Sequence, residues 1–298
     1  MISVKKISKK KWKEIGFFSV MIIIPIIHFC IFWIGVNINS FAMAFQGKNG
    51  PTFDYIKLFF QELTTAGTSN KLLEGIKNTL IIFGLNILVL LPLSVLFSYF
   101  LYKKLICYKY LRVVFFLPSI ISSVVLVTLY KEILNGPVSN LLMQISGSSS
   151  PILFFDSTKY AFRSVLMYIT WLGLAGNMVI YSGTMSRTPT EIVESAKLDG
   201  IGYFGELTRI VLPLMWPTLS VIVLLAVVGI FTADGPILLM TQGQYETYTL
   251  GYWFYDKTIV NPNLNYGAAV GICFTLVSIP LTLFARWLVN RIDVDVEF

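Results

Sequence analysis

The sequence predicts a polytopic α-helical membrane protein with little mass outside the bilayer. Of its 298 residues, 55% are hydrophobic and only 13% are charged. The charged residues are unevenly placed and leave six charge-free stretches long enough to cross a bilayer, which takes about 20 apolar residues. A chain of this pattern excludes a soluble enzyme.

Each of these stretches is expected to form one membrane-spanning helix. In chain order they cover residues 15–47, 78–102, 113–130, 164–186, 210–233 and 258–285. The third is the shortest, yet its 18 residues still extend about 27 Å as a helix. A seventh charge-free stretch, 133–155, contains Asn135-Gly136-Pro137 and a Gly-Ser-Ser-Ser-Pro run. These are turn signals, so this stretch is expected to be a loop.

The placement of Lys and Arg predicts the orientation. With the N-terminus inside, 15 of the 23 basic residues lie on the inner side and 8 on the outer side, as the positive-inside rule requires. We therefore expect residues 1–14 to be a basic cytosolic tail and 15–37 to be the first transmembrane helix. Residues 78–290 should form a core of five further transmembrane helices, with both termini in the cytosol.

The composition also limits the partners and sites. The net charge of +7 lies mostly beside the spans, so anionic lipid explains it better than nucleic acid, and no nucleic-acid partner is expected. A basic start before an apolar run is also typical of a signal peptide, but this run is too long, which favours a retained first span. The single histidine, His28, and three dispersed cysteines lack the clustering of a metal or catalytic site, so neither is expected.

A polar segment at residues 191–213, between the fourth and fifth spans, reads EIVESAKLDGIGYFGELTRIVLP. The spacing of Thr188 and Glu191 predicts a capping box, with Pro189 in the first helical position. Gly200 predicts a break, because glycine readily takes the left-handed conformation that ends a helix.

The second half of the segment predicts another helix. Phe204, Leu207 and Val211 recur at helical spacing, and Pro213 is expected to start the next span. Two short helices joined at a glycine should therefore project from the membrane. An ordinary amphipathic loop is the simpler alternative.

The segment resembles the EAA signature of permease subunits of ABC importers, in which E-A-A-x-x-D-G-A is followed by F-x-x-I-x-L-P. The matching residues are Glu194, Ala196, Asp199, Gly200, Ile210, Leu212 and Pro213. Ser195 and Ile201 stand where alanines are usual, and Leu207 stands where Phe is usual. In that family the hairpin is the coupling helix, which docks in a cleft of the cytosolic ATPase.

The resemblance covers nearly the whole chain and points to the carbohydrate-permease branch. The further motifs are Asn39-Ser40-Phe41, Asn78-Thr79-Leu80, Arg112 with Phe116-Leu117-Pro118, Trp171-Leu172-Gly173 and Tyr266-Gly267-Ala268-Ala269. The chain departs from the family at Asp234-Gly235-Pro236, which comes earlier than the usual Gly-Gly-Pro. The resemblance implies an all-α, six-helix type I ABC importer permease in the bacterial plasma membrane. Its cytosolic coupling-helix hairpin, residues 189–212, lies between spans four and five.

The same resemblance implies the partners. They are a second homologous permease subunit, two cytosolic ATPase subunits, an extracellular solute-binding protein or lipoprotein, and the lipid bilayer. The chain has no Walker A string, so we expect no cofactor in it, and ATP and Mg²⁺ on the ATPase subunits. The charge-free spans also lack the carboxylates of ion-coupled carriers, so energy should enter through the hairpin.

The hairpin residues expected to take part in ATPase coupling are Glu191, Glu194, Ala196, Asp199, Gly200, Phe204, Leu207 and Pro213. Glu194 is expected either to pair with a basic group of the ATPase or to cap backbone amides at a helix start, and Asp199 to cap the second short helix. Phe204 and Leu207 are expected to be the apolar side chains that enter the ATPase cleft. Simple solvated charges are the alternative for the acids.

Polar groups inside the spans are costly and tend to face a cavity or another helix. The residues expected along a substrate path are Trp171, Asn177, Asn86, Ser122 and Tyr181. Trp171 and Asn177 lead because sugars stack on aromatic rings and their hydroxyls bond amides. Maltose is not implied, because Ile169 and Gly176 stand where maltose-binding members have Asn and Tyr.

Several alternatives stay open from sequence. The cargo is expected to be a carbohydrate, most simply an oligosaccharide, with a peptide, polyol, phosphodiester or amino acid as alternatives. An ion-coupled carrier or a membrane enzyme is the alternative from another class. The aromatic segment 233–266 is expected either to form an interfacial belt or to dock an external partner.

Overall fold

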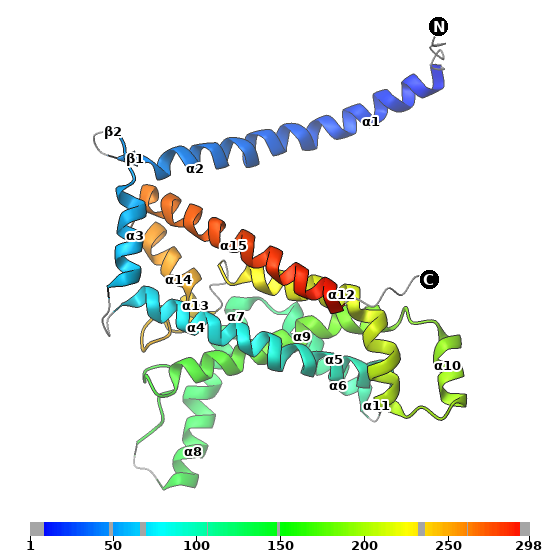
Figure 1. Ribbon diagram of the computed structural model, residues 1–298. Coiled ribbons are helices and arrows are strands. Elements are labelled where there is room, and N and C mark those ends of the chain that lie inside the picture. The colour runs from blue at the N-terminus through cyan, green and yellow to red at the C-terminus, as the bar shows by residue number, and fades with distance from the viewer. Residues whose placement is uncertain are drawn as a thin grey trace.

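The computed structural model describes most of the chain and shows a molecule built almost entirely of helices (Figure 1). The described residues are 9–47, 50–65, 70–105, 107–147, 150–231, 236–260 and 262–292. The predicted all-helical membrane fold is confirmed.

The elements fall into two halves of the chain. Those of the first half are α1 (Lys9–His28), η1 (Phe29–Gly35), α2 (Val36–Ala44), β1 (Gln46–Gly47), β2 (Gly50–Pro51), α3 (Asp54–Thr64), α4 (Lys71–Leu85), η2 (Asn86–Leu90), α5 (Leu91–Tyr102), α6 (Tyr108–Ile120), α7 (Ser123–Ile133), η3 (Leu134–Val138) and α8 (Ser139–Ser146). Those of the second half are α9 (Ala161–Met185), α10 (Thr190–Leu198), α11 (Tyr203–Glu206), η4 (Leu207–Val211), α12 (Leu212–Gly229), α13 (Ile237–Met240), α14 (Leu250–Tyr255), η5 (Asp256–Val260) and α15 (Leu264–Ile292). The strands β1 and β2 pair antiparallel.

The described residues contain five continuous helices that are long and apolar enough to cross a membrane. They are Lys13–Ala44, Lys71–Tyr102, Ala161–Met185, Tyr203–Gly229 and Leu264–Arg291. A bent pair, Tyr108–Pro118 with Ser123–Ser146, supplies the sixth. The beginning of α1 and the end of α15 lie at the same end of the molecule as α10 and α11 (Figure 1). We call this the hairpin end.

The third span differs from its prediction as one helix over residues 113–130. Its two pieces meet at 107°, with extended backbone at Ile121 and Ser122 between them. Pro118 contributes to the break, because it removes a hydrogen bond from the last turn of α6. The prediction of a loop over 133–155 is wrong as far as Ser146. A π-helical turn, η3, accommodates Pro137 and lets the helix continue.

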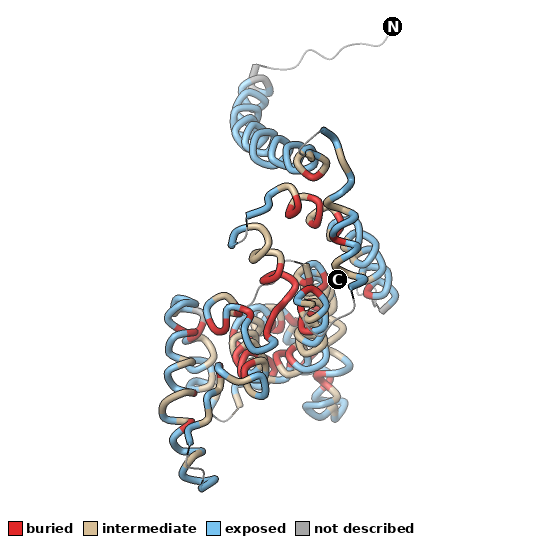
Figure 2. The backbone as a smooth tube through the Cα atoms, turned by 90° about the vertical axis from the view of Figure 1, so that its left-hand side faces the viewer, coloured by how far each residue is buried: buried red, intermediate tan, exposed pale blue. Residues whose placement is uncertain are grey.

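Most buried hydrophobic residues fall into two clusters in the body of the molecule, where much of the buried backbone in Figure 2 lies. The larger one surrounds Trp253 and Tyr168 and gathers side chains from α3, α4, α7, α9 and the segment 236–273. The smaller one, around Tyr181 and Met215, joins α5, α9 and the beginning of the fifth span at the hairpin end.

The aromatic segment 233–266 divides between core and surface, since Gln242, Gln244 and Tyr245 are exposed. Asp234 and Gly235 lie outside the described residues. Beyond them Tyr248, Tyr252 and Trp253 are buried in the larger cluster. These aromatics are core, because the segment folds back between α3, α4 and α15.

The second span holds this segment with buried polar bonds at the end opposite the hairpin. Asn78 Nδ2 donates to the backbone carbonyls of Glu246 (3.0 Å) and Tyr248 (2.8 Å). Thr79 Oγ1 accepts from the N–H of Leu250 at 2.9 Å. In an apolar setting such bonds are expensive to leave unmade, so they fix the register of the segment on α4. The span begins at Lys71 and not at the predicted residue 78, so this Asn-Thr pair lies inside the helix, where it faces the segment.

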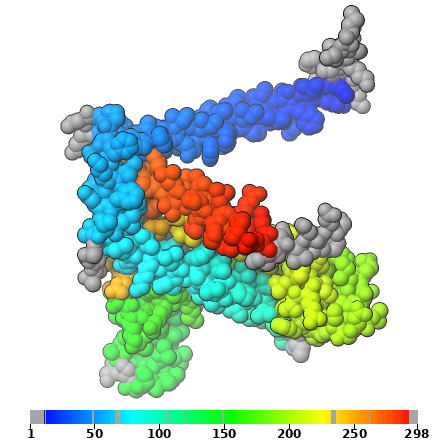
Figure 3. Space-filling model, viewed as in Figure 1, coloured from blue at the N-terminus to red at the C-terminus, as the bar shows by residue number. Residues whose placement is uncertain are grey.

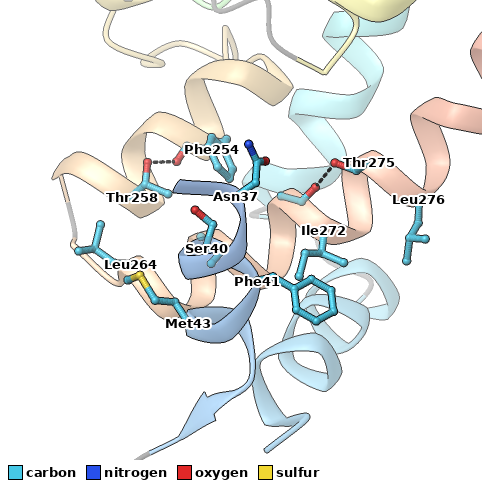
Figure 4. Close-up of a pocket in the computed structure, with 13 residues that line it drawn as sticks. Asn37, Ser40, Phe41, Met43, Phe254, Thr258, Leu264, Ile272, Thr275 and Leu276 are labelled. Carbon is cyan, nitrogen blue, oxygen red and sulfur yellow. Dashed lines mark hydrogen bonds between the residues drawn. The ribbon is translucent and has the colours of Figure 1, made fainter. Parts of the chain in front are cut away.

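The first span lies largely apart from the rest of the chain (Figure 3). None of its most apolar 18-residue window is buried. It contacts the body through α2, which packs on α15. A groove of about 760 Å³ remains between these helices. Figure 4 shows Asn37, Ser40 and Phe41 lining it from α2, and Ile272 and Thr275 lining it from α15.

The close approach of α4 to the aromatic segment generates a prediction at Gly75. A Cβ there would lie 3.1 Å from the carbonyl carbon of Thr249 and 3.3 Å from the nitrogen of Leu250. Gly75→Val should therefore lower the stability by about 1–3 kcal/mol through overpacking. The measurement is the thermal unfolding midpoint in detergent.

Gly84→Val is the matched control, because Gly84 lies in the same helix and a Cβ there meets nothing within 4 Å. Equal unfolding midpoints for the two variants would contradict the proposed backbone contact.

Candidate functional site

The segment between the fourth and fifth spans forms a hairpin that projects from the body (Figure 1). Its first arm is α10, and its turn lies at Gly200, whose φ of +77° is the predicted left-handed conformation. Its second arm, α11, is not a separate short helix. It continues through η4 into α12 as one helix, Tyr203–Gly229. The fifth span thus begins at Tyr203 and not at Pro213, because the π-helical turn precedes and accommodates the proline.

The predicted capping arrangement does not form. Helix α10 begins at Thr190, so Pro189 stands before the helix with an extended ψ of 131°, and within the described chain its cap makes no side-chain hydrogen bond. This extension moves Thr188, which is buried, too far back to cap the first turn. Nor does Asp199 cap the second arm, because Gly202 occupies that cap position.

The turn of the hairpin carries an exposed apolar surface. Leu198 is 90% exposed, Phe204 76% and Tyr203 64%. Side chains of this size gain free energy when a partner covers them, and exposed apolar groups on either side of one turn are suited to such a contact. Leu198 and Tyr203 escaped the sequence reasoning, since only periodic positions were followed there.

Leu207 differs from its expected role as an outward apolar side chain. It is 4% exposed and packs in the smaller cluster beside Val211. Phe204, three residues earlier, is instead 76% exposed. Leu207 thus lies against α5 and α9, while Phe204 stands at the edge of this contact and points to the outside.

The remaining hairpin residues divide between a hollow and the surface. A shallow depression of about 460 Å³ is lined by Glu191, Ile192, Ser195, Ala196, Asp199, Ile201 and Ile210. Ala196 is buried at its floor, while Glu191 and Asp199 are exposed at its edge. Glu194 is exposed in the middle of α10 and Pro213 is half-buried. The hairpin thus combines a hollow, two acids at its rim and an apolar turn.

A buried ion pair joins the hairpin to the second span. Glu206 in α11 pairs with Lys103, which follows α5, and their side chains are only 3% and 10% exposed. The sequence does not predict this pair, because Lys103 is one of the many basic residues beside the spans and Glu206 lies about one hundred residues away. The available signal was a glutamate adjoining the buried apolar face of Leu207 and Val211.

The residues expected along a substrate path are scattered. Asn86, at the start of η2, lines a cavity of about 360 Å³ together with Ser123, Tyr168 and Leu239. Trp171 packs edge-on against Tyr168, with 6.0 Å between ring centroids. The second and fourth spans therefore meet here with an amide, a hydroxyl and two aromatic rings.

The other three residues lie elsewhere. Ser122 is exposed at the break in the third span, and Asn177 is half-buried farther along α9. Tyr181 is fully buried in the smaller cluster at the hairpin end. In this conformation Tyr181 is a core residue, because α5 and α12 both pack over its face of α9.

Six spans with a projecting hairpin between the fourth and fifth define the class, which is the permease fold of type I ABC importers. The family model of the binding-protein-dependent transport system inner membrane component matches residues 79–294, so the chain belongs to this family. It is therefore a multi-pass membrane component of a binding-protein-dependent ABC transport system and not an enzyme.

Curated relatives are transport permeases. The chain is 25% identical over 211 residues to the lactose transport system permease protein LacF of Rhizobium radiobacter, covering 68% of this chain and 71% of that protein. It is 22% identical over 283 residues to the multiple sugar-binding transport system permease protein MsmF of Streptococcus mutans, covering 93% and 94%.

A solved structure has the same fold. A chain of a bacterial ABC transporter involved in the import of the acidic polysaccharide alginate superimposes with a TM-score of 0.80 at 24% identity. The match covers 96% of this chain and 100% of that chain. The predicted six-helix permease fold is confirmed.

The opposite burial of Phe204 and Leu207 generates a prediction. Leu207→Ala removes a side chain from the smaller cluster and should destabilise the protein by about 2–5 kcal/mol. Phe204→Ala removes an exposed side chain and should leave the thermal unfolding midpoint in detergent almost unchanged. The reverse order of the two midpoints would contradict the orientation of the second arm.

Proposed function

We propose that this chain is the permease subunit of an ATP-driven importer whose cargo is a carbohydrate, most simply an oligosaccharide. The observation that carries the proposal is the hairpin with its exposed apolar turn, in a chain whose family imports through partner proteins. The carbohydrate cargo is supported by the relatives, which are named as lactose and multiple-sugar permeases. The cavity lined by Asn86, Ser123 and Tyr168 suits a sugar, since it combines an amide, hydroxyls and an aromatic ring, and Trp171 packs against that ring from outside the lining.

The hairpin is proposed to dock on a cytosolic ATPase. Phe204, Leu198 and Tyr203 supply the apolar contact, while Glu191 and Asp199 at the rim suit basic groups of the partner. ATP and Mg²⁺ are proposed to bind the two ATPase subunits and not this chain. Closure of those subunits would displace the hairpin and so drive the spans.

The proposed orientation places the hairpin and both termini in the cytosol of a bacterial cell. Its support is the excess of Lys and Arg on that side. The shared position of the beginning of α1, the end of α15 and the hairpin agrees with it (Figure 1).

A second permease subunit and an extracellular solute-binding protein are proposed to complete the importer. The first span, whose most apolar window is unburied, offers a long apolar surface for another membrane subunit and for lipid. A related fold has been crystallised with an alginate pentasaccharide-bound periplasmic protein. We propose that a comparable protein approaches the end of this chain opposite the hairpin.

The turn at Gly200 provides the test of ATPase docking. Gly200→Val places a β-branched side chain at φ +77°, which costs about 1–2 kcal/mol and should displace Leu198 and Phe204 from their positions. Co-purification of the ATPase with the tagged permease should fall sharply, while the amount of permease in the membrane stays the same.

Gly202→Val is the matched control, because Gly202 has φ −76° and a Cβ there meets open space. It should retain the ATPase. If Gly200→Val retained it equally, the hairpin would not be the docking site.

The cargo is tested on the cognate solute-binding protein. Isothermal titration against a panel of neutral and acidic oligosaccharides, peptides, polyols and amino acids should give heat with an oligosaccharide. Tight binding of a peptide or amino acid, with no response to any glycan, would reject the carbohydrate assignment.

A further inference from the structure

The buried ion pair between Lys103 and Glu206 occupies the point where two spans meet the hairpin. Lys103 directly follows α5, the last part of the second span, and Glu206 ends α11, the second arm of the hairpin. Helices α11 and α12 belong to one continuous span. The pair therefore connects the second span to the root of the fifth.

Aromatic rings from both sides surround the lysine. Its Nζ lies 5.5 Å from the ring centroid of Tyr102, 5.6 Å from that of Tyr99 and 6.0 Å from that of Tyr203. The Tyr99 hydroxyl donates to the backbone carbonyl of Tyr203 at 3.1 Å. A cation at such distances from tyrosine faces is attracted to each ring, most strongly when water is excluded.

Burial makes the Lys103–Glu206 pair favour one arrangement of the second span against the second arm of the hairpin. With side chains only 10% and 3% exposed, each charge depends on the other for most of its compensation. A buried charge that loses its partner is strongly unfavourable. The pair consequently resists sliding of the second span against the second arm far more than apolar contacts alone would.

The two arms of the hairpin are attached very differently. Most of α10 is exposed, and only Val193 and Ala196 are buried in it. The second arm instead holds the ion pair and leads to Leu207 and Val211, which lie in the smaller cluster with α5 and α9. The second arm is therefore the more firmly attached route from the turn into the body.

We propose that Lys103 and Glu206 form a mechanical tie that makes the second and fifth spans move together when the hairpin is displaced. They are positioning residues for transport, since they act through the spans and not on the cargo. This inference rests on the proposed docking of an ATPase at the hairpin. The opposite end of the second span is already held by Asn78 and Thr79 on the segment 246–250, so motion of α5 is delivered along the whole span.

The test measures one distance in the assembled importer, in nanodiscs, by double electron–electron resonance. Spin labels replace Thr208 in the second arm and Phe100 in α5, both exposed, after Cys30, Cys107 and Cys273 are changed to serine. The complex is compared without nucleotide and trapped with Mg-ATP and vanadate. The wild-type pair should give one narrow distance distribution that is the same in both states.

The informative variant is the double substitution Lys103→Met/Glu206→Leu. Replacing both partners of a buried pair with apolar residues of similar volume preserves folding, so this variant removes the tie without leaving a lone charge. Its distance distribution should broaden or shift on trapping. Stimulation of ATP hydrolysis by the solute-binding protein should also fall, by about tenfold, a typical coupling effect. Lys103→Arg keeps the charge and should behave as the wild type.

Glu62→Gln is the matched control. It breaks the Lys257–Glu62 pair (3.0 Å), whose side chains are 34% and 37% exposed, at the opposite end of the molecule. It should leave the distance unchanged. The tie is rejected if the double variant keeps the wild-type distribution in both states, or if the wild-type distance itself changes on trapping. Failure of the ATPase to co-purify with the wild type would instead reject the docking proposal, before any distance is measured.

Discussion

Buried polar contacts at both ends of the second span hold the structure in one arrangement. At one end Asn78 and Thr79 bond the backbone of residues 246–250, and at the other Lys103 pairs with Glu206. Apolar packing between helices is nonspecific in register, whereas a buried donor or charge has only one satisfactory partner. The span therefore links the aromatic segment to the hairpin, and the fourth span packs along it.

The hairpin is exposed at its turn and buried at its second arm. Its turn exposes Leu198 and Phe204, while its second arm buries Glu206 and Leu207. The change occurs within one turn of helix, because neighbouring positions on a helix face different directions. A surface suited to a partner protein is thereby joined rigidly to the core of the permease.

The body of the molecule offers a modest polar wall and a large apolar one. Asn86, Tyr168 and Trp171 gather where the second and fourth spans meet, whereas the most apolar part of the first span has no buried residue. This asymmetry fits a subunit that shares its passage with another membrane chain.

Much of the fold followed from local signals. The charge-free stretches predicted the spans, and Gly200 predicted the turn of the hairpin. The motif around Asp199 and Pro213 indicated the family. Each signal is local, since helix formation and membrane insertion depend on neighbouring residues in the chain. The same reasoning could not foresee that Thr188 would be too far back to cap α10, nor that the third span would break near Pro118.

What only the tertiary structure decided is which side chains face one another. Helical spacing placed Phe204 and Leu207 together, yet Leu207 is buried by α5 and α9. Tyr181 lies in the same cluster, and Tyr248, Tyr252 and Trp253 of the aromatic segment are buried in the larger one. Lys103 pairs with Glu206, which is more than one hundred residues away in the sequence. The sequence by itself determined the number of spans and the existence of the hairpin, because those depend on composition and period. The buried partners depend on which helices come to lie side by side, and that is a property of the folded chain as a whole.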